Sequence, residues 1–228
     1  VETKKFKNFR NSGINRLSMG IQALNNKDLK RLGRLHSVQE AKNAFNIASE
    51  NFNNVSFDLI YGRQQQTLRD WETELLDAIK MSIGHLSLYQ LTIEENTRFG
   101  ELLSKGKLQG LPDDNISVDF YNLTNDICES ENLPAYEISN HAKKGDECRH
   151  NLNYWRGGAF LGVGPGAHGR LNIENKRYLT EAPSNPDLWL KLVKDQKFET
   201  FTSEHLSNNE QANEYIMMGL RLREGISL

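Results

Sequence analysis

The sequence is poor in cysteine, carries almost no excess of charge and contains no long apolar run. Its 228 residues include two cysteines, Cys128 and Cys148, which suits a reducing compartment and predicts a cytoplasmic location. The net charge is −2, so neither nucleic acid nor a membrane surface is expected as a partner. No apolar stretch approaches the roughly 20 residues that a membrane span needs, and no segment resembles a signal peptide.

The most informative segment is residues 150–155, His-Asn-Leu-Asn-Tyr-Trp, which a glycine-rich stretch follows at 162–169. Histidine, tyrosine and tryptophan within six residues offer an axial ligand and two flat faces, a combination that suits a planar tetrapyrrole. Glycines without side chains allow the backbone to approach a ligand closely. A buried aromatic turn, in which His150 caps a loop, is the alternative on these residues alone.

Further segments of the chain share one recognisable pattern with this motif. They are residues 15–22, 32–37, 58–62, 88–94, 148–151 and 217–222. In this order they closely resemble the oxygen-independent coproporphyrinogen III oxidase family of radical S-adenosylmethionine (SAM) proteins. Within that family the match is to the HemW branch, the haem chaperones. The resemblance extends over essentially the whole chain.

One part of the family pattern is missing. The family begins with a Cys-x-x-x-Cys-x-x-Cys loop that binds a 4Fe–4S cluster, whereas this chain has two distant cysteines and no such loop. The chain also starts at Val1, in a segment that resembles the helix after the family's third barrel strand, and it ends at Leu228, where the family's C-terminal domain would begin. We therefore expect a truncated relative that does not perform radical chemistry on its own.

The first half alternates between strand and helix patterns, which favours parallel βαβ units. Ser37 and Glu40 have the spacing of a capping box. Strands are expected at 17–21, 55–61 and 85–91, and helices at 26–32, from Ser37 through Ala48, and at 67–81. The predicted fold is α/β: the C-terminal part of a radical-SAM partial (β/α)6 barrel, about three parallel strand–helix units, plus an α+β extension. The edge of the strand at 17–21 would be unpaired and would favour aggregation.

The second half has a different pattern. We expect a helix at 113–131 with Val118, Tyr121, Leu123 and Ile127 on one side, short strands at 135–139 and 160–163, a helix that Asn185 caps, and a helix at 208–223 that Gly225 ends. The predicted domains are residues 1–96 for the partial barrel, 97–205 for the extension with the His-Asn-x-x-Tyr-Trp segment, and 206–228 for the start of a C-terminal domain.

Three polar residues fall at or near the carboxyl ends of the expected strands, where barrels of this kind bind ligands. Gln22 follows one strand, Asp58 lies inside an apolar strand where an unpaired carboxylate is costly, and Arg34 could pair with a carboxylate. A strand-end cap, a backbone partner and a surface position are the respective alternatives. The resemblance assigns all three to SAM, together with Thr92, which matches a backbone contact near the adenine.

The turn after Asp58 departs from the family pattern. The family continues Leu-Pro-Gly-Gln-Thr, whereas this chain has Arg63, three glutamines and Thr67. Glutamine does not fix φ as proline does, and it disfavours the positive φ that glycine adopts readily. This turn would lie beside the SAM pocket, so its change makes an intact SAM site less expected.

The resemblance assigns the 150–155 segment to haem binding. His150 is the predicted axial ligand, Tyr154 and Trp155 would pack on the ring, and Asn151 would orient the loop or the imidazole. His168 is a second haem or porphyrin candidate, with a core histidine after a glycine turn as its alternative. No catalytic residue is assigned, and no iron–sulfur cluster is expected in this chain.

The sequence therefore predicts a truncated HemW-like protein that binds haem and delivers it to acceptor proteins. A separate N-terminal chain could complete the barrel. The alternatives are a coproporphyrinogen III oxidase, which would perform an oxidative decarboxylation, a non-functional gene remnant, and a structural subunit that docks another chain. The sequence does not specify the haem acceptor or the oligomeric state.

Overall fold

The computed structural model describes residues 3–195 and 201–227, and they form two compact units, Val1–Glu147 and Cys148–Leu228. The sequence-predicted boundaries at 96/97 and 205/206 do not coincide with this division, because α6 (Asp114–Ser130) and β4 (Asn140–Ala142) lie beyond residue 96 and pack in the first unit. The structure does not test whether the three predicted ranges match the domains of the family, so that assignment stays a prediction.

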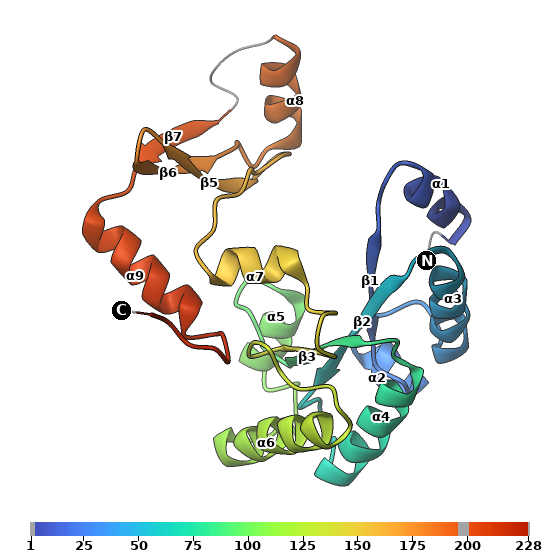
Figure 1. Cartoon of the computed structure of the whole chain (residues 1–228). Helices are drawn as coiled ribbons and strands as arrows, with labels where there is room; N and C mark the ends of the chain where they lie inside the picture. The colour runs from blue at the N-terminus through green and yellow to red at the C-terminus, as the bar shows by residue number, and fades with distance from the viewer. Residues whose placement is uncertain (1–2, 196–200, 228) are drawn as a thin grey trace. The chain divides into compact units, whose positions relative to one another are not determined.

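The first unit is built on a four-stranded sheet with the order β1-β2-β3-β4 (Figure 1). Strands β1 (Arg16–Gln22), β2 (Asn54–Tyr61) and β3 (His85–Gln90) are parallel, and β4 (Asn140–Ala142) is antiparallel to β3. The helical elements are η1 (Thr3–Lys5), α1 (Phe6–Asn11), α2 (Asn26–Arg31), α3 (Val38–Asn51), α4 (Leu68–Met81), α5 (Arg98–Ser104) and α6 (Asp114–Ser130). The predicted α/β fold with three parallel strands is confirmed, and β1 is an edge strand as expected.

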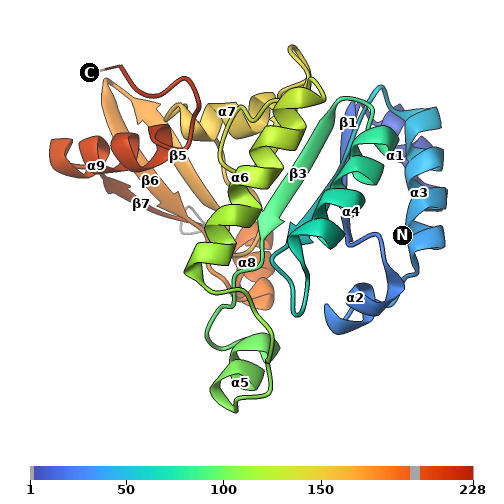
Figure 2. The same ribbon diagram turned by 90° about the horizontal axis from the view of Figure 1, so that it is seen from below.

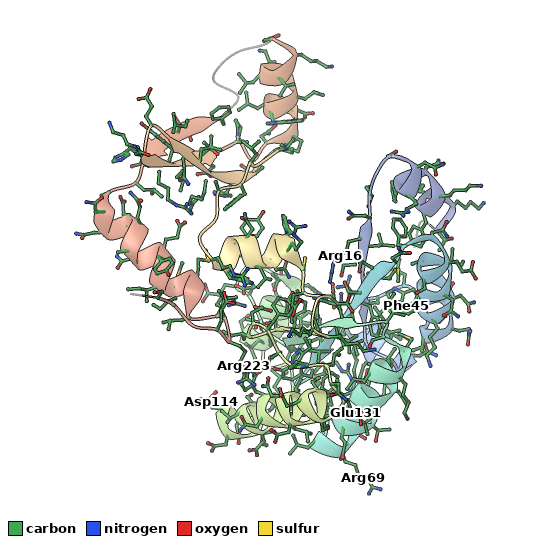
Figure 3. The ribbon with its side chains drawn as sticks, in the orientation of Figure 1. Arg16, Phe45, Arg69, Asp114, Glu131 and Arg223 are labelled. Atoms are coloured by element: carbon green, nitrogen blue, oxygen red, sulfur yellow. The ribbon has the colours of Figure 1, made fainter. Side chains whose placement is uncertain are left out.

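Helices α3 and α4 lie on one side of the parallel strands (Figure 2), and the core fills the space between. Phe45 of α3 points to the sheet (Figure 3) and packs edge-on against Phe57 of β2, with ring centroids 5.2 Å apart. Tyr61 of β2 stacks on Trp71 of α4 at 5.3 Å. The predicted buried stripe on α3 is confirmed; its members are Ala41, Ala44, Phe45 and Ala48.

Helix α6 lies within the predicted range, and Leu123 and Ile127 of the predicted face pack against the core, but the fully buried positions are different ones. Val118 and Tyr121 are exposed, whereas Phe120, Thr124 and Cys128 are buried. The reason is a polar contact in the core: the Trp71 indole N–H donates to Thr124 Oγ1 at 2.8 Å. This hydrogen bond offsets the burial of a hydroxyl, which the apolar pattern of the sequence does not reveal.

The second unit contains α7 (Arg149–Trp155), a three-stranded antiparallel sheet of β5 (His168–Ile173), β6 (Lys176–Glu181) and β7 (Thr202–His205), and helices α8 (Pro186–Lys194) and α9 (Asn208–Gly219). The N-cap of α8 is Asn185, as predicted. Glu214 of α9 joins its helix to the sheet through Arg170 and Arg177 at 2.8 and 3.0 Å. Burial acts to raise the pKa of Glu214, but the two arginine hydrogen bonds outweigh it and lower the pKa.

Two predicted strands are wrong. In the predicted strand at 135–139 Ala135 and Glu137 are isolated bridge residues, and the strand is β4 at Asn140–Ala142. In the predicted strand at 160–163 only Phe160 forms a bridge, to Arg170. β4 begins with the polar Asn140, whose amide oxygen accepts from Ser87 across the sheet, so a search for apolar runs places the strand too early.

The predicted helix at 208–223 is too long. α9 ends at Gly219, and Leu222 N–H donates to the Gly219 carbonyl in a tighter turn. The following chain folds back over Gly219, where a Cβ would lie 2.0 Å from the side chain of Ile226. Gly225 does adopt a positive φ of 72°, within this returning segment and not at the helix end.

Candidate functional site

The face of the sheet opposite the α3 and α4 helices is polar. Alternate residues of a strand point to opposite faces, and Met19 and Phe57 belong to the helix-covered core. Ser18 of β1, Asp58 of β2 and Ser87 of β3 therefore lie on the other face. This open face brings together hydroxyl and carboxyl groups near the middle of the parallel strands.

Asp58 is held on this face by hydroxyl groups. Its Oδ1 accepts a hydrogen bond from Ser18 Oγ at 3.0 Å. Burial raises the pKa of Asp58, and hydrogen bonding with Ser18 and Ser87 partly offsets this effect. The partners of the carboxylate are thus side-chain hydroxyls and not the backbone amide or lysine considered from the sequence.

Gln22 lies at the carboxyl end of β1 in an unusual backbone conformation. Its φ is 79°, and the register between β1 and β2 shifts between Gly20 and Gln22. A Cβ on Gly20 would lie 2.5 Å from Gln22 Nε2, so the glutamine side chain folds back over the glycine. Non-glycine residues with positive φ are strained and concentrate at functional sites. The register pairs Gly20 with Asp58 and Gln22 with Leu59, so Gln22 lies one register position beyond Asp58 on the neighbouring strand.

The other two SAM candidates are exposed loop residues. Arg34 follows α2, where its backbone N–H donates to Leu29 O at 2.8 Å. Thr92 follows β3, with its hydroxyl 3.4 Å from the Gln90 carbonyl oxygen. The roles of all four residues toward SAM stay predictions.

The glutamine turn after β2 does contain the positive φ that glutamine disfavours: φ of Gln65 is 57°. Two contacts hold it: Gln65 N–H donates to Gly110 O at 2.6 Å, and Arg31 Nη2 donates to Gln65 Oε1 at 2.8 Å. Beside it, Arg63 is buried and pairs with Asp28 at 3.0 Å and with Glu74. Sequence reasoning missed this ion cluster, for which the only signal was an arginine in place of the family's leucine.

A polar cavity of about 490 Å³ lies over this turn. Its lining includes Asp28, Arg63 and Glu74 of the ion cluster together with the three glutamines of the turn. The Leu24 backbone N–H donates to Glu74, so the loop after β1 is fixed to α4 by the same carboxylate that pairs with Arg63. The cluster therefore fixes the positions of the loops that follow the carboxyl ends of β1 and β2.

In the second unit, residues 150–155 form most of α7 and not a loop between strands. His150 is exposed, and its ring meets Tyr154 edge-on at 4.6 Å between centroids. Tyr154 in turn packs against Phe160 at 4.3 Å. Among the residues that the structure describes, no hydrogen bond engages the His150 ring. The imidazole is thus oriented by an aromatic support and presented to solvent.

Trp155 lies about 140° around the helix axis from His150, at about 100° per residue. The Arg221 guanidinium carbon lies over its ring at 4.3 Å, a cation–π contact that occupies one ring face. Asn151 is four residues before Trp155 and so shares its side of the helix. The structure therefore brings His150 and Tyr154 together and places Trp155 elsewhere on α7.

His168 is the exposed first residue of β5, with Nε2 4.0 Å from a carboxylate oxygen of Glu181. The glycine stretch before it serves close backbone packing: a Cβ on Gly162 would lie 2.3 Å from His168 O. A cavity of about 170 Å³ with apolar walls lies beside this stretch, lined by Gly162, Gly164 and Trp189 among others. It is smaller than the roughly 300 Å³ at which pockets for drug-sized ligands begin.

The two cysteines lie in different units. Cys128 is buried in α6, where burial raises the pKa of its thiol to about 12. Cys148 is the N-cap residue of α7. Within residues 3–195 and 201–227, no group of three or more histidine, cysteine or acidic side chains is placed to hold a metal ion. No helix of that part of the chain is long and apolar enough to cross a membrane.

No family model matches the chain. Among curated proteins it is 39% identical to the mitochondrial radical S-adenosyl methionine domain-containing protein 1 of Dictyostelium discoideum, with 99% of this chain and 55% of that protein covered. It is 43% identical to heme chaperone HemW of Haemophilus influenzae over 76% of this chain and 44% of that protein. For heme chaperone HemW of Bacillus subtilis the identity is 32%, over 100% of this chain and 59% of that protein.

Among solved structures, coproporphyrinogen III oxidase (HemN) from Escherichia coli, a radical SAM enzyme, superposes with a TM-score of 0.76 and 18% identity. The superposition covers 97% of this chain and 53% of that one, and it shows the fold. The chain spans about half the length of the curated relatives that it matches.

Proposed function

Because the chain is homologous to radical-SAM proteins named heme chaperone HemW over about half of their length, we propose that it is the haem-binding part of a HemW-like haem chaperone. The observation that carries the proposal is the exposed His150 imidazole, supported edge-on by Tyr154 on α7. A neutral imidazole nitrogen is a common ligand of haem iron. Haem, when bound, is the cargo that such a protein would deliver to an acceptor protein.

Each residue has a separate part in this proposal. His150 supplies the lone pair of one ring nitrogen, and Tyr154 limits rotation of the imidazole through the edge-on contact. Asn151 and Trp155 hold α7 in place on its other side, and His168 is a second histidine from which an iron ligand could come. The residues of this chain fit haem, because their imidazole nitrogens are donors that haem iron accepts and because these side chains are exposed.

The first unit fits SAM as a second ligand of the same proposal. Asp58 on the open face has a pKa that burial raises, so a bound diol that donates to the carboxylate would offset part of its desolvation. Gln22 adjoins Asp58, whereas Arg34 and Thr92 would contribute from exposed loops. The two cysteines lie in different units and do not fit a 4Fe–4S cluster. A segment outside these residues, paired to the edge of β1, would have to supply that cluster and complete the barrel.

The proposal is tested by titrating the purified 228-residue chain with haemin. We expect saturable binding with a shifted Soret band, at least tenfold weaker in His150→Ala and little changed in His168→Ala if His150 is the axial ligand. His205→Ala is the matched control, because His205 is also exposed and also meets a tyrosine edge-on, Tyr178 at 5.6 Å. Equal binding by wild type, His150→Ala and His205→Ala would refute the assignment.

Oxidative decarboxylation of coproporphyrinogen is the alternative activity, and no observation on this chain favours it over haem delivery. Turnover by this chain alone, under anaerobic reducing conditions with SAM, would contradict the proposal that the cluster is supplied elsewhere.

A cytoplasmic location belongs to the same proposal. It rests on the low cysteine content of the sequence, and relatives with mitochondrial names mark the other compartment to test.

A further inference from the structure

A row of hydrogen-bonding side chains crosses the open face of the sheet at one level. The register places Asp58 of β2 opposite Ser87 of β3, and Ser87 opposite Asn140 of β4. Beyond Asn140 lies Glu137. Ser87 and Asn140 are each 4% exposed and Glu137 is 1% exposed. Apart from Asp58, none of these residues was a candidate from the sequence.

The direction of each hydrogen bond in this row follows from the end at Glu137. Asn140 Nδ2 donates to Glu137 Oε1, and the Ser139 N–H donates to the same oxygen at 2.9 Å. Because Glu137 Oε1 accepts both bonds, the nitrogen end of the Asn140 amide faces it. The amide oxygen of Asn140 then faces Ser87, whose hydroxyl donates to it at 2.8 Å.

Ser87 stands between two acceptors with a single proton. Its hydroxyl is close enough to Asp58 to lower the pKa of that carboxyl, yet it donates to Asn140. A hydroxyl can donate only one hydrogen bond at a time. While Asn140 holds the proton of Ser87, Ser18 is the one hydroxyl among the described side chains that donates to Asp58.

We propose that Glu137 and Asn140 are positioning residues that draw the Ser87 proton away from Asp58 and so leave one carboxylate oxygen of Asp58 open to the hydroxyls of a ligand. The ligand class is a vicinal diol, such as the ribose of a nucleoside. This ligand clause rests on the SAM role proposed for Asp58, whereas the effect on Asp58 itself does not.

The first test measures the titration of Asp58 in the chain without ligand, by NMR of the carboxyl carbon with Asp58→Asn as the assignment control. Asn140→Ala frees the Ser87 proton to turn to Asp58, so the pKa of Asp58 should fall. Adding Ser87→Ala to that variant should remove the fall. Ser18→Ala is the matched control on β1, and it should raise the pKa because it deletes a donor.

Tyr89 also faces Asp58 from β3. Burial and the Asp58 charge raise the pKa of its phenol, and hydrogen bonds with Ser87 and Asn140 partly offset this rise. The comparison is therefore repeated in a Tyr89→Phe background, where no phenol can take the Ser87 proton. Glu137 is present in each of these variants. If Asn140→Ala does not fold, Glu137→Leu replaces it. Leucine accepts no hydrogen bond, so that variant releases the Asn140 amide, but it also deletes a charge, and only the part of the change that Ser87→Ala abolishes counts.

A fall of the Asp58 pKa that depends on Ser87 supports the proposal, since a purely structural role for Asn140 would change stability without it. An unchanged Asp58 pKa in folded Asn140→Ala, or a fall that persists after Ser87→Ala, would overturn it.

The second test concerns the proposed diol ligand. It measures the affinities for adenosine and for 2′,3′-dideoxyadenosine by calorimetric titration. We expect Asn140→Ala to weaken adenosine binding by roughly ten- to a hundredfold, about the effect of one hydrogen bond to a charged group, and to leave the dideoxy analogue unaffected. If wild type binds neither nucleoside, the SAM role of Asp58 and the ligand clause fail together, and the NMR result still decides the positioning role. Equal weakening of both nucleosides would overturn the ligand clause alone.

Discussion

At the scale of single residues, His85 makes the stability of the first unit depend on pH. Burial above all, with the positive charges of Arg16 and His141, lowers the pKa of His85 to about 3 from its ordinary value of 6.5. Between these values the unfolded chain binds a proton that the folded chain does not. The contribution of His85 to stability is therefore complete above about pH 6.5 and is lost as the pH falls toward 3.

We predict that acid destabilises wild type by a few kcal/mol more than His85→Gln between about pH 6.5 and pH 4. The comparison is made by urea unfolding at a series of pH values, with His205→Gln as the control because His205 is exposed. Parallel pH profiles for wild type and His85→Gln would show that this histidine does not carry the dependence.

Single residues also mark the limit of sequence reasoning about the site. A carboxylate inside an apolar strand was recognisable at Asp58, because its burial demands partners. Its partners were not recognisable: Ser18 and Ser87 are ordinary serines until the register brings them beside it. The strain at Gln65 was anticipated from the altered turn and is confirmed by its φ of 57°. Its support by Arg31 depends on tertiary packing, which the sequence does not display.

At the scale of elements, helix caps follow local rules. Ser37 caps α3 with both hydrogen bonds of a capping box, as predicted from its spacing to Glu40. We predict that Ser37→Ala lowers the free energy of unfolding by about 1 kcal/mol. The matched control is Ser49→Ala in the same helix, where the hydroxyl bonds only the Phe45 carbonyl and alanine favours the helix. Equal losses in chemical denaturation would show that the cap has no special weight.

Elements that depend on distant partners were harder to predict than those with local signals. The apolar spacing and caps of α3 and α4 gave their type and extent. β4 could not be placed in this way, because Asn140 and His141 suit a strand only when β3 lies beside them. The motif at 150–155 was expected to lie between two strands and is a helix, α7, with a bridge only at Phe160.

At the scale of the whole molecule, the unpaired edge of β1 is the feature that most affects association with other chains. A groove of about 270 Å³ runs along it, lined by Phe6, Phe9, Leu17 and Ile21 among others. An edge strand beside apolar side chains is a template for pairing with another chain. A second copy of this chain and a strand from another segment would both pair through this edge of β1.

We predict that the protein associates with itself as its concentration rises, and that Phe9→Lys weakens this association at least several-fold, because it places a charge in the groove beside β1. Sedimentation velocity at a series of concentrations measures the effect. Phe201→Lys is the control, since Phe201 is half exposed but belongs to the second unit. Equal effects of the two substitutions would indicate general stickiness instead of edge pairing.

The two cysteine thiols have different surroundings, and this difference allows one of them to be labelled selectively. Cys128 is sealed in the first unit with its thiol pKa raised to about 12, whereas Cys148 lies at the start of α7, two positions before His150. A maleimide dye at neutral pH should consequently attach to Cys148 alone. Quenching of that dye as an iron porphyrin arrives would report loading in real time, and it would do so without altering any residue of the helix that we propose as the porphyrin site.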